Sequence, residues 1–104
     1  MSSNWIHDVI DKGEIKPNKK IYAIFESLPN MKSIKSIRVS CKCIKAEYNY
    51  KYRDLHVKIS VGEIPYHLKE QGFQEVIKFI TIIYEDDTNE VLKIKYTIKD
   101  GTSI

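Results

Sequence analysis

The chain is 104 residues long, which is enough for one hydrophobic core and too short for two. Hydrophobic residues make up 42% and charged residues 30% of the sequence, a balance typical of a soluble globular domain rather than a disordered tail. The net charge of +3 is small beside the concentrated basic face of nucleic-acid-binding proteins. We therefore expect a single domain over residues 1–104, with an N-terminal extension at about residues 1–18.

Simple patterns exclude other classes of protein. No apolar run approaches the roughly 20 residues that cross a bilayer, and the first residues lack the basic and apolar regions of a secretory signal. The two cysteines are too few for a disulfide-rich scaffold. We expect no membrane partner and no export.

The apolar residues favour strands over helices. The sequence contains 17 Ile and 6 Val but only 4 Leu and 2 Ala, together with 7 Tyr. Branched and aromatic side chains suit a pleated, half-buried surface, whereas a helical protein accumulates Ala and Leu. The composition therefore predicts an all-β chain.

The first half of the chain contains an apolar segment at residues 5–10 and then several strand patterns. Residues 20–26 alternate apolar and polar side chains, which predicts a strand with one buried face. The next strand begins near Ile37, and its buried face is expected to continue through Val39 to the two cysteines. A further strand is expected over residues 44–48.

Residues 54–61 and 92–99 give the clearest strand patterns. Apolar and polar side chains alternate in both without an error, which predicts antiparallel strands with one buried and one wet face. Residues 62–72 are bounded by glycines and interrupted by Pro65, which has no amide hydrogen for a sheet. We expect a crossover loop there, with one helical turn at most.

The strand predicted at residues 75–84 is apolar on both faces, and an acidic turn links it to the last strand. If one face fills the core, then Ile77, Phe79 and Ile83 point outward. Each would forgo about 1.5–3 kcal/mol if left in water rather than buried, so we expect a cover for this face. Either another part of the chain or a docked protein could supply it.

Short strands with turns between them predict a small β-sandwich of about seven strands. Its expected core is Trp5, Ile21, Phe25, Ile37, Val39, Val57, Ile59, Ile80, Ile82, Leu92 and Ile94.

The cysteines are the first candidates for chemistry. Cys41 and Cys43 on one strand would face the same way and could together hold a soft metal ion. A structural zinc site needs four ligands, and the three histidines are scattered along the chain. A disulfide between the two is not expected, because it would close a very small, strained ring. The favoured interpretation is two small buried thiols in the core. Because no nucleophile, base and orienting acid come together, we expect no enzyme and no cofactor.

Residues 48–53 interleave tyrosines with cations. On one strand, Tyr48, Tyr50 and Tyr52 would form a stripe that stacks on bases, with Lys51 and Arg53 near phosphates. The same side chains are favoured anchors in protein interfaces, and a strand running into a hairpin tip would also produce the pattern. We expect Tyr50, Tyr52 and Arg53 to serve as secondary anchors for a protein partner.

The order of these motifs resembles a family of Ig-like β-sandwich domains of unknown function from Bacteroidetes-type bacteria and tailed phages. Its hallmark is Cys-Gly-Cys-Thr at the end of a strand, followed by a Pro-containing loop and a Lys-x-Ile-x-Val strand. The likeness covers about residues 19–99, but Lys42 stands in place of the Gly and Ile44 in place of the Thr.

The resemblance implies an Ig-like antiparallel β-sandwich and, with no export signal, the phage branch of the family. It implies a non-enzymatic structural module, a decoration or cementing protein of a tailed-phage capsid or virion, assembled in the host cytoplasm. Its partners would be capsid or other virion proteins. The apolar pattern of residues 75–84, rather than the resemblance, predicts that Ile77, Phe79 and Ile83 bind them. The alternatives are an intracellular module that binds nucleic acid or protein through residues 48–53, and a soft-metal-binding domain.

Overall fold

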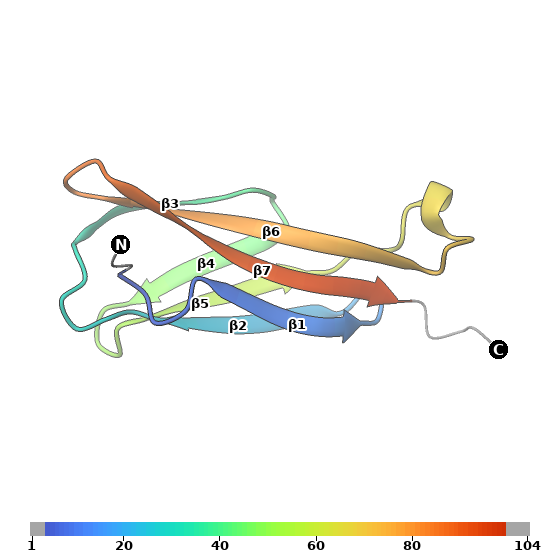
Figure 1. The fold of residues 1–104 in the computed structure, drawn as a ribbon, viewed down its shortest axis with the longest axis horizontal. Helices are drawn as coiled ribbons and strands as arrows, with labels where there is room; N and C mark the ends of the chain where they lie inside the picture. The colour runs from blue at the N-terminus through green and yellow to red at the C-terminus, as the bar shows by residue number, and fades with distance from the viewer. Residues whose placement is uncertain (1–3, 100–104) are drawn as a thin grey trace.

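The computed structural model describes residues 4–99. Alternating apolar side chains form seven strands, and the loop before the sixth contains a single 3₁₀ turn (Figure 1). In chain order the elements are β1 (Val9–Ile15), β2 (Lys20–Glu26), β3 (Ile34–Val39), β4 (Ile44–Asn49), β5 (Asp54–Ser60), η1 (Tyr66–Leu68), β6 (Phe73–Tyr84) and β7 (Asn89–Lys99).

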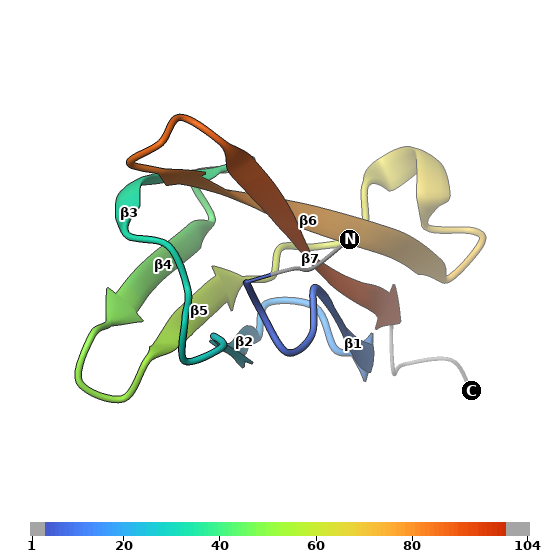
Figure 2. The same cartoon turned by 60° about the vertical axis from the view of Figure 1, so that its left-hand side comes forward.

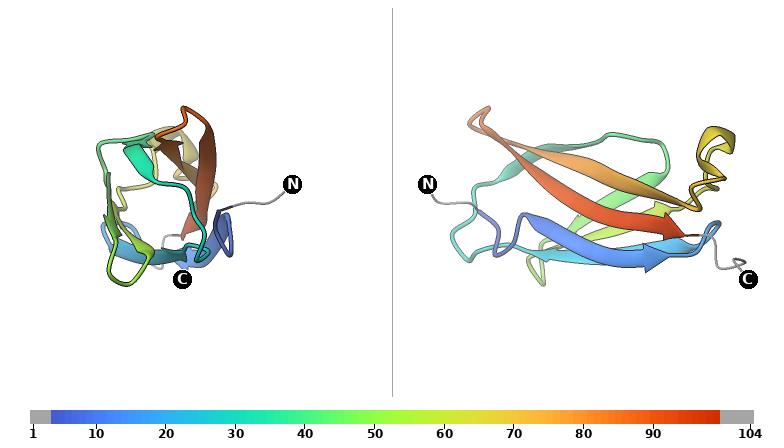
Figure 3. Two further views of the ribbon diagram at one scale, coloured as in Figure 1. Left: turned by 90° about the vertical axis from the view of Figure 1, so that its left-hand side faces the viewer. Right: turned by 45° about the vertical axis from the view of Figure 1, so that its right-hand side comes forward.

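The strands form two sheets that pack face to face, as the end-on view in Figure 3 shows. One sheet has the order β1-β7-β6-β3 and the other the order β2-β5-β4. All pairs are antiparallel except β1 and β7, which run parallel. This arrangement places β2, β4 and β5 in one sheet and β3, β6 and β7 in the other. Immunoglobulin domains divide their strands between two sheets in the same way. The predicted all-β, Ig-like sandwich of seven strands is confirmed.

The segment expected as an N-terminal extension takes part in the sandwich. Trp5 bridges to Ser27 just after β2, and the backbone amide of Ile6 donates to the carbonyl of Glu26 at 2.9 Å. β1 then crosses to the four-stranded sheet and pairs with β7, with a break in register between Asp11 and Glu14. Residues 1–3 lie outside the described part of the chain.

The core lies between the two sheets. The largest fully buried side chains are Tyr84, Phe25, Leu55, Ile59, Ile80, Ile82, Leu92 and Ile94. All residues of the predicted core are buried except Ile37, which is half-buried, and Val39, which is 38% exposed. Ile37 still packs against the core. The prediction for Val39 is wrong because β3 is the edge strand of its sheet, and Val39 is its last residue.

Four chain segments meet at one end of the molecule. They are the N-terminal residues, the loop after β2, the hairpin between β4 and β5, and the turn between β6 and β7 (Figures 1 and 2). The predicted loop at residues 62–72 and its 3₁₀ turn lie at the opposite end. Within residues 4–99, no helix is long and apolar enough to cross a bilayer.

Candidate protein-docking face

The outer face of the four-stranded sheet carries a group of exposed apolar side chains. The register places Val9, Lys93 and Phe79 side by side on three neighbouring strands. Val91 lies opposite Thr81 in the next row, and Ile77 is two residues before Phe79 on the same face. We call Val9, Ile77, Phe79, Val91 and Lys93 together the Phe79 face.

The apolar members of this face are open to solvent. The exposed fractions are 48% for Ile77, 44% for Val9, 41% for Val91 and 40% for Phe79. These side chains surround Lys93, whose Nζ lies 6.0 Å from the centre of the Phe79 ring. The arrangement is an apolar patch of four side chains around Lys93, with exposed Lys95 opposite Ile77 on the same face.

The predicted outward direction of Ile77 and Phe79 is confirmed, and neither proposed internal cover reaches them. The N-terminal segment lies against the end of β2 instead, and the loop at residues 62–72 lies beyond the start of β6. Ile83 points to the same side but is half-buried. The expectation that another part of the chain covers this face is therefore wrong for Ile77 and Phe79.

The tyrosine stripe considered for residues 48–53 does not form, and the alternative of a strand that runs into a hairpin tip is confirmed. β4 ends at Asn49, whose Oδ1 accepts hydrogen bonds from the backbone amides of Lys51 (2.9 Å) and Tyr52 (3.1 Å). An asparagine that caps its own backbone in this way begins a turn, so the chain reverses before the stripe can extend. This Asx turn is the sequence signal that the strand interpretation missed.

The aromatic residues of this segment are instead divided between the core and the hairpin tip. Tyr48 points inward and meets Trp5 edge to face at a centroid distance of 5.9 Å. Tyr50 and Tyr52 are exposed at 68% and 67% on the tip. Arg53 adopts a φ of 57°, and its carbonyl accepts the Ser27 hydroxyl at 2.7 Å.

The two groups of predicted partner-binding residues do not form one surface. Ile77, Phe79 and Ile83 face outward from the four-stranded sheet, whereas Tyr50, Tyr52 and Arg53 lie in a hairpin of the three-stranded sheet. A flat partner that covers the first group would leave the second uncovered.

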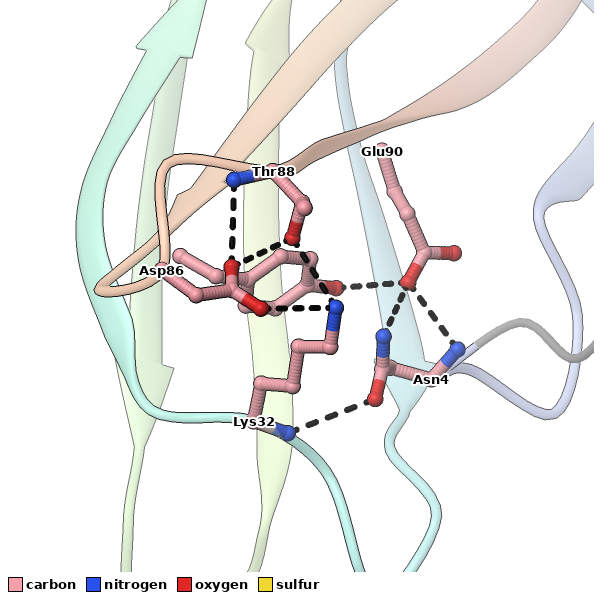
Figure 4. A network of polar contacts seen from close by, with 6 residues as sticks. Asn4, Lys32, Asp86, Thr88 and Glu90 are labelled. Carbon is pink, nitrogen blue, oxygen red and sulfur yellow. Dashed lines mark hydrogen bonds and ion pairs between the residues drawn. The ribbon is translucent and has the colours of Figure 1, made fainter.

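A polar network ties the loops together at this end of the molecule (Figure 4). The hydroxyl of buried Tyr84 accepts from the indole nitrogen of Trp5 at 2.9 Å and donates to Glu90 at 2.9 Å. The same Glu90 oxygen accepts from the backbone and side-chain amides of Asn4. Burial, and then the Glu90 hydrogen bond, raises the pKa of Tyr84. The network keeps the phenol protonated and fixes the N-terminal segment to β7.

A second part of the network lies on the surface. Lys32 forms an ion pair with Asp86 at 2.9 Å and a hydrogen bond with Thr88 at 3.0 Å. The Thr88 hydroxyl, followed by Lys32, lowers the pKa of Asp86 to about 2. The loop after β2 is thereby joined to the β6–β7 turn.

The cysteines lie in the turn between β3 and β4 rather than on a strand. Cys41 and Cys43 form a disulfide with a Cα–Cα distance of 5.2 Å, so the prediction of two free buried thiols is wrong. β3 stops at Val39 because the chain there leaves its sheet and crosses to the other. With the sulfurs bonded to each other, neither is available as a thiolate ligand for a metal ion.

The histidine of β5 lies at the surface beside a carboxylate. His56 Nε2 lies 2.9 Å from Asp54 Oδ1 on the outer face of β5. Within residues 4–99, no three His, Cys, Asp or Glu side chains gather closely enough to hold a metal ion.

Comparisons with known proteins give no relative for this chain. No family model, no curated protein and no solved structure matches it.

Proposed function

We propose that this domain is a non-enzymatic structural module that docks onto another protein through the Phe79 face. The proposed setting is the capsid or virion of a tailed phage, where the domain would act as a decoration or cementing protein. The resemblance of the cysteine motif and the strand order supports this setting, and the exposed Phe79 face supports the docking.

The observation that carries the proposal is the apolar area of this face. Full burial of such a side chain is favourable by about 1.5–3 kcal/mol, and four of them are two-fifths to one-half exposed. Covering the four would therefore contribute roughly 3–5 kcal/mol before the cost of association. That is large enough to anchor a weak interface, which a multivalent particle surface would strengthen.

The cation in the centre of the face adds a requirement for the partner. Lys93 would be buried along with its apolar neighbours, and a buried ammonium must be paired. Lys95 lies next to it opposite Ile77, so a complementary surface would carry apolar side chains and acidic groups that pair with both lysines. We expect added salt to lower the affinity for such a partner only moderately, because the apolar area and not the charge pairing supplies most of the affinity.

The test compares two double variants, each of which removes two exposed apolar side chains. Ile77→Ser with Phe79→Ser removes the apolar area of the proposed face, and Tyr22→Ser with Ile24→Ser removes 62% and 52% exposed side chains from the outer face of the other sheet. Each variant is mixed with purified phage particles from the phage whose genome encodes the chain, and the protein that sediments with the particles is measured. We expect the first pair to lose binding while the second pair binds normally.

Loss of binding by both pairs, or by Tyr22→Ser with Ile24→Ser alone, would contradict docking through this face. Absence of the chain from purified, nuclease-treated particles would contradict the virion setting but leave the docking face to be tested with other partners. A strongly salt-dependent mobility shift with DNA or RNA, lost with Lys51→Gln and Arg53→Gln, would favour the nucleic-acid alternative.

A further inference from the structure

The Cys41–Cys43 disulfide closes a ring that contains a single intervening residue. It lies in the turn where the chain crosses from β3 in one sheet to β4 in the other. Both cysteines are partly exposed, and Lys42 between them is exposed. Both cysteine side chains also pack against the hydrophobic core.

The position of this disulfide indicates that it contributes little to the fold. A disulfide stabilises mainly by restricting the unfolded chain, and this effect is smallest for the shortest loops. The turn also has its own backbone hydrogen bonds, from Ile44 to the Cys41 carbonyl and from Ser60 to the Cys43 carbonyl at 2.9 Å. Opening the sulfur–sulfur bond breaks neither of them.

The surroundings of the pair favour a thiolate once the bond is opened. The backbone amide of Cys43 donates a hydrogen bond to Cys41 Sγ at 3.1 Å, and such a donor stabilises negative charge on the sulfur. Between Ser27 and Ala46 the sequence contains basic residues and no carboxylate. Positive charge near a cysteine lowers its pKa and makes it a better leaving group.

From these observations we propose that Cys41 and Cys43 form a redox-active pair that exchanges disulfides with a dithiol. A thiolate of the dithiol attacks Cys43 Sγ, the Cys41–Cys43 bond breaks, and Cys41 leaves as a thiolate held by the Cys43 amide. The second thiol of the dithiol then closes its own disulfide and releases Cys43. Two electrons and two protons pass to the protein, the dithiol is oxidised, and Cys41 and Cys43 become thiols.

The first test is a redox titration of the full chain in buffers of reduced and oxidised glutathione. The thiols are trapped by alkylation and counted by mass spectrometry, while circular dichroism reports the fold. We expect millimolar reduced glutathione to open the pair and oxidised glutathione to close it again, with an unchanged β spectrum. A bond that stays closed until denaturant is added would instead be structural, and thiols that do not close again would also overturn the proposal.

The second test measures the pH dependence of alkylation of the reduced protein. We expect an apparent thiol pKa below the ordinary value of about 8.5. Lys42→Gln should slow alkylation at neutral pH about threefold, the effect of one screened charge a few ångströms away. The matched control is Lys12→Gln on β1, at the opposite edge of the sheet from β3. A thiol pKa at or above the ordinary value, or equal effects of the two variants, would contradict the proposal.

Discussion

The hydroxyl of Tyr84 offers the sharpest test of how the loop end of this sandwich is held. The side chain is fully buried, and its only polar atom links the Trp5 indole to the Glu90 carboxylate. Tyr84→Phe keeps the ring in the core and removes that single atom. The variant therefore isolates the polar network from the packing around it.

The expected loss follows from the two hydrogen bonds. A bond to a charged acceptor contributes about 1.5–3 kcal/mol, and taking the partner from a buried donor costs about 1–3 kcal/mol. Since both bonds share one hydroxyl, their effects do not add fully, and we expect a loss of about 3 kcal/mol. With an unfolding entropy of about 2.1 cal/mol/K per residue, that loss lowers the melting temperature by roughly 14 °C.

Tyr96→Phe is the matched control. Tyr96 is also buried, at 4% exposure, but its hydroxyl makes no hydrogen bond within residues 4–99. We expect its removal to change stability by less than about 0.5 kcal/mol. The measurement is urea unfolding followed by tryptophan fluorescence, because Trp5 is the only tryptophan and lies in the network.

Equal losses in the two variants would show that burial of the phenol, and not its hydrogen bonds, determines the effect. A loss below about 1 kcal/mol for Tyr84→Phe would refute the structural role of the network, because one bond alone should exceed it.

Three further outcomes are expected. Because the raised pKa of Tyr84 favours the protonated phenol in the folded state, stability should be full below about pH 10 and fall above it, less steeply in Tyr84→Phe, as measured by urea unfolding at alkaline pH. The pKa of Asp86 is lowered to about 2, so its contribution to the free energy of unfolding is present above about pH 4 and lost as the pH falls toward 2. The difference in stability between the wild type and Asp86→Asn should vanish over that range. Ile80→Ala should cost about 2–5 kcal/mol and Val39→Ala less than about 1 kcal/mol, because only Ile80 is buried; similar losses in thermal unfolding would contradict the edge position of Val39.

Alternating side chains made most of the fold predictable. The pattern in residues 54–61 identifies the inward face of β5, and Leu55, Val57 and Ile59 are all buried there. The prediction failed where the chain turns. The end of β4 depends on the hydrogen bonds of one asparagine side chain. β3 ends where the chain crosses to the other sheet, although β6 continues beyond this point.

The candidate site was predictable along one strand but not across strands. Ile77 and Phe79 follow from the alternation within β6, and both point outward. Val9, Val91 and Lys93 join them only through the register of β6 and β1 with β7. The parallel pairing of β1 with β7 connects the two ends of the chain, and no local pattern in the sequence indicates such a contact.

That parallel pairing also determines how the domain responds to mechanical force. The molecule is 50 Å long, and β1 and β7 run side by side so that the start of β1 and the end of β7 lie at opposite ends of this pair (Figure 1). A pull on the two ends would slide β1 along β7 and load their hydrogen bonds together, in shear. Several bonds must then break at once, so the rate of forced unfolding depends on this one pair of strands.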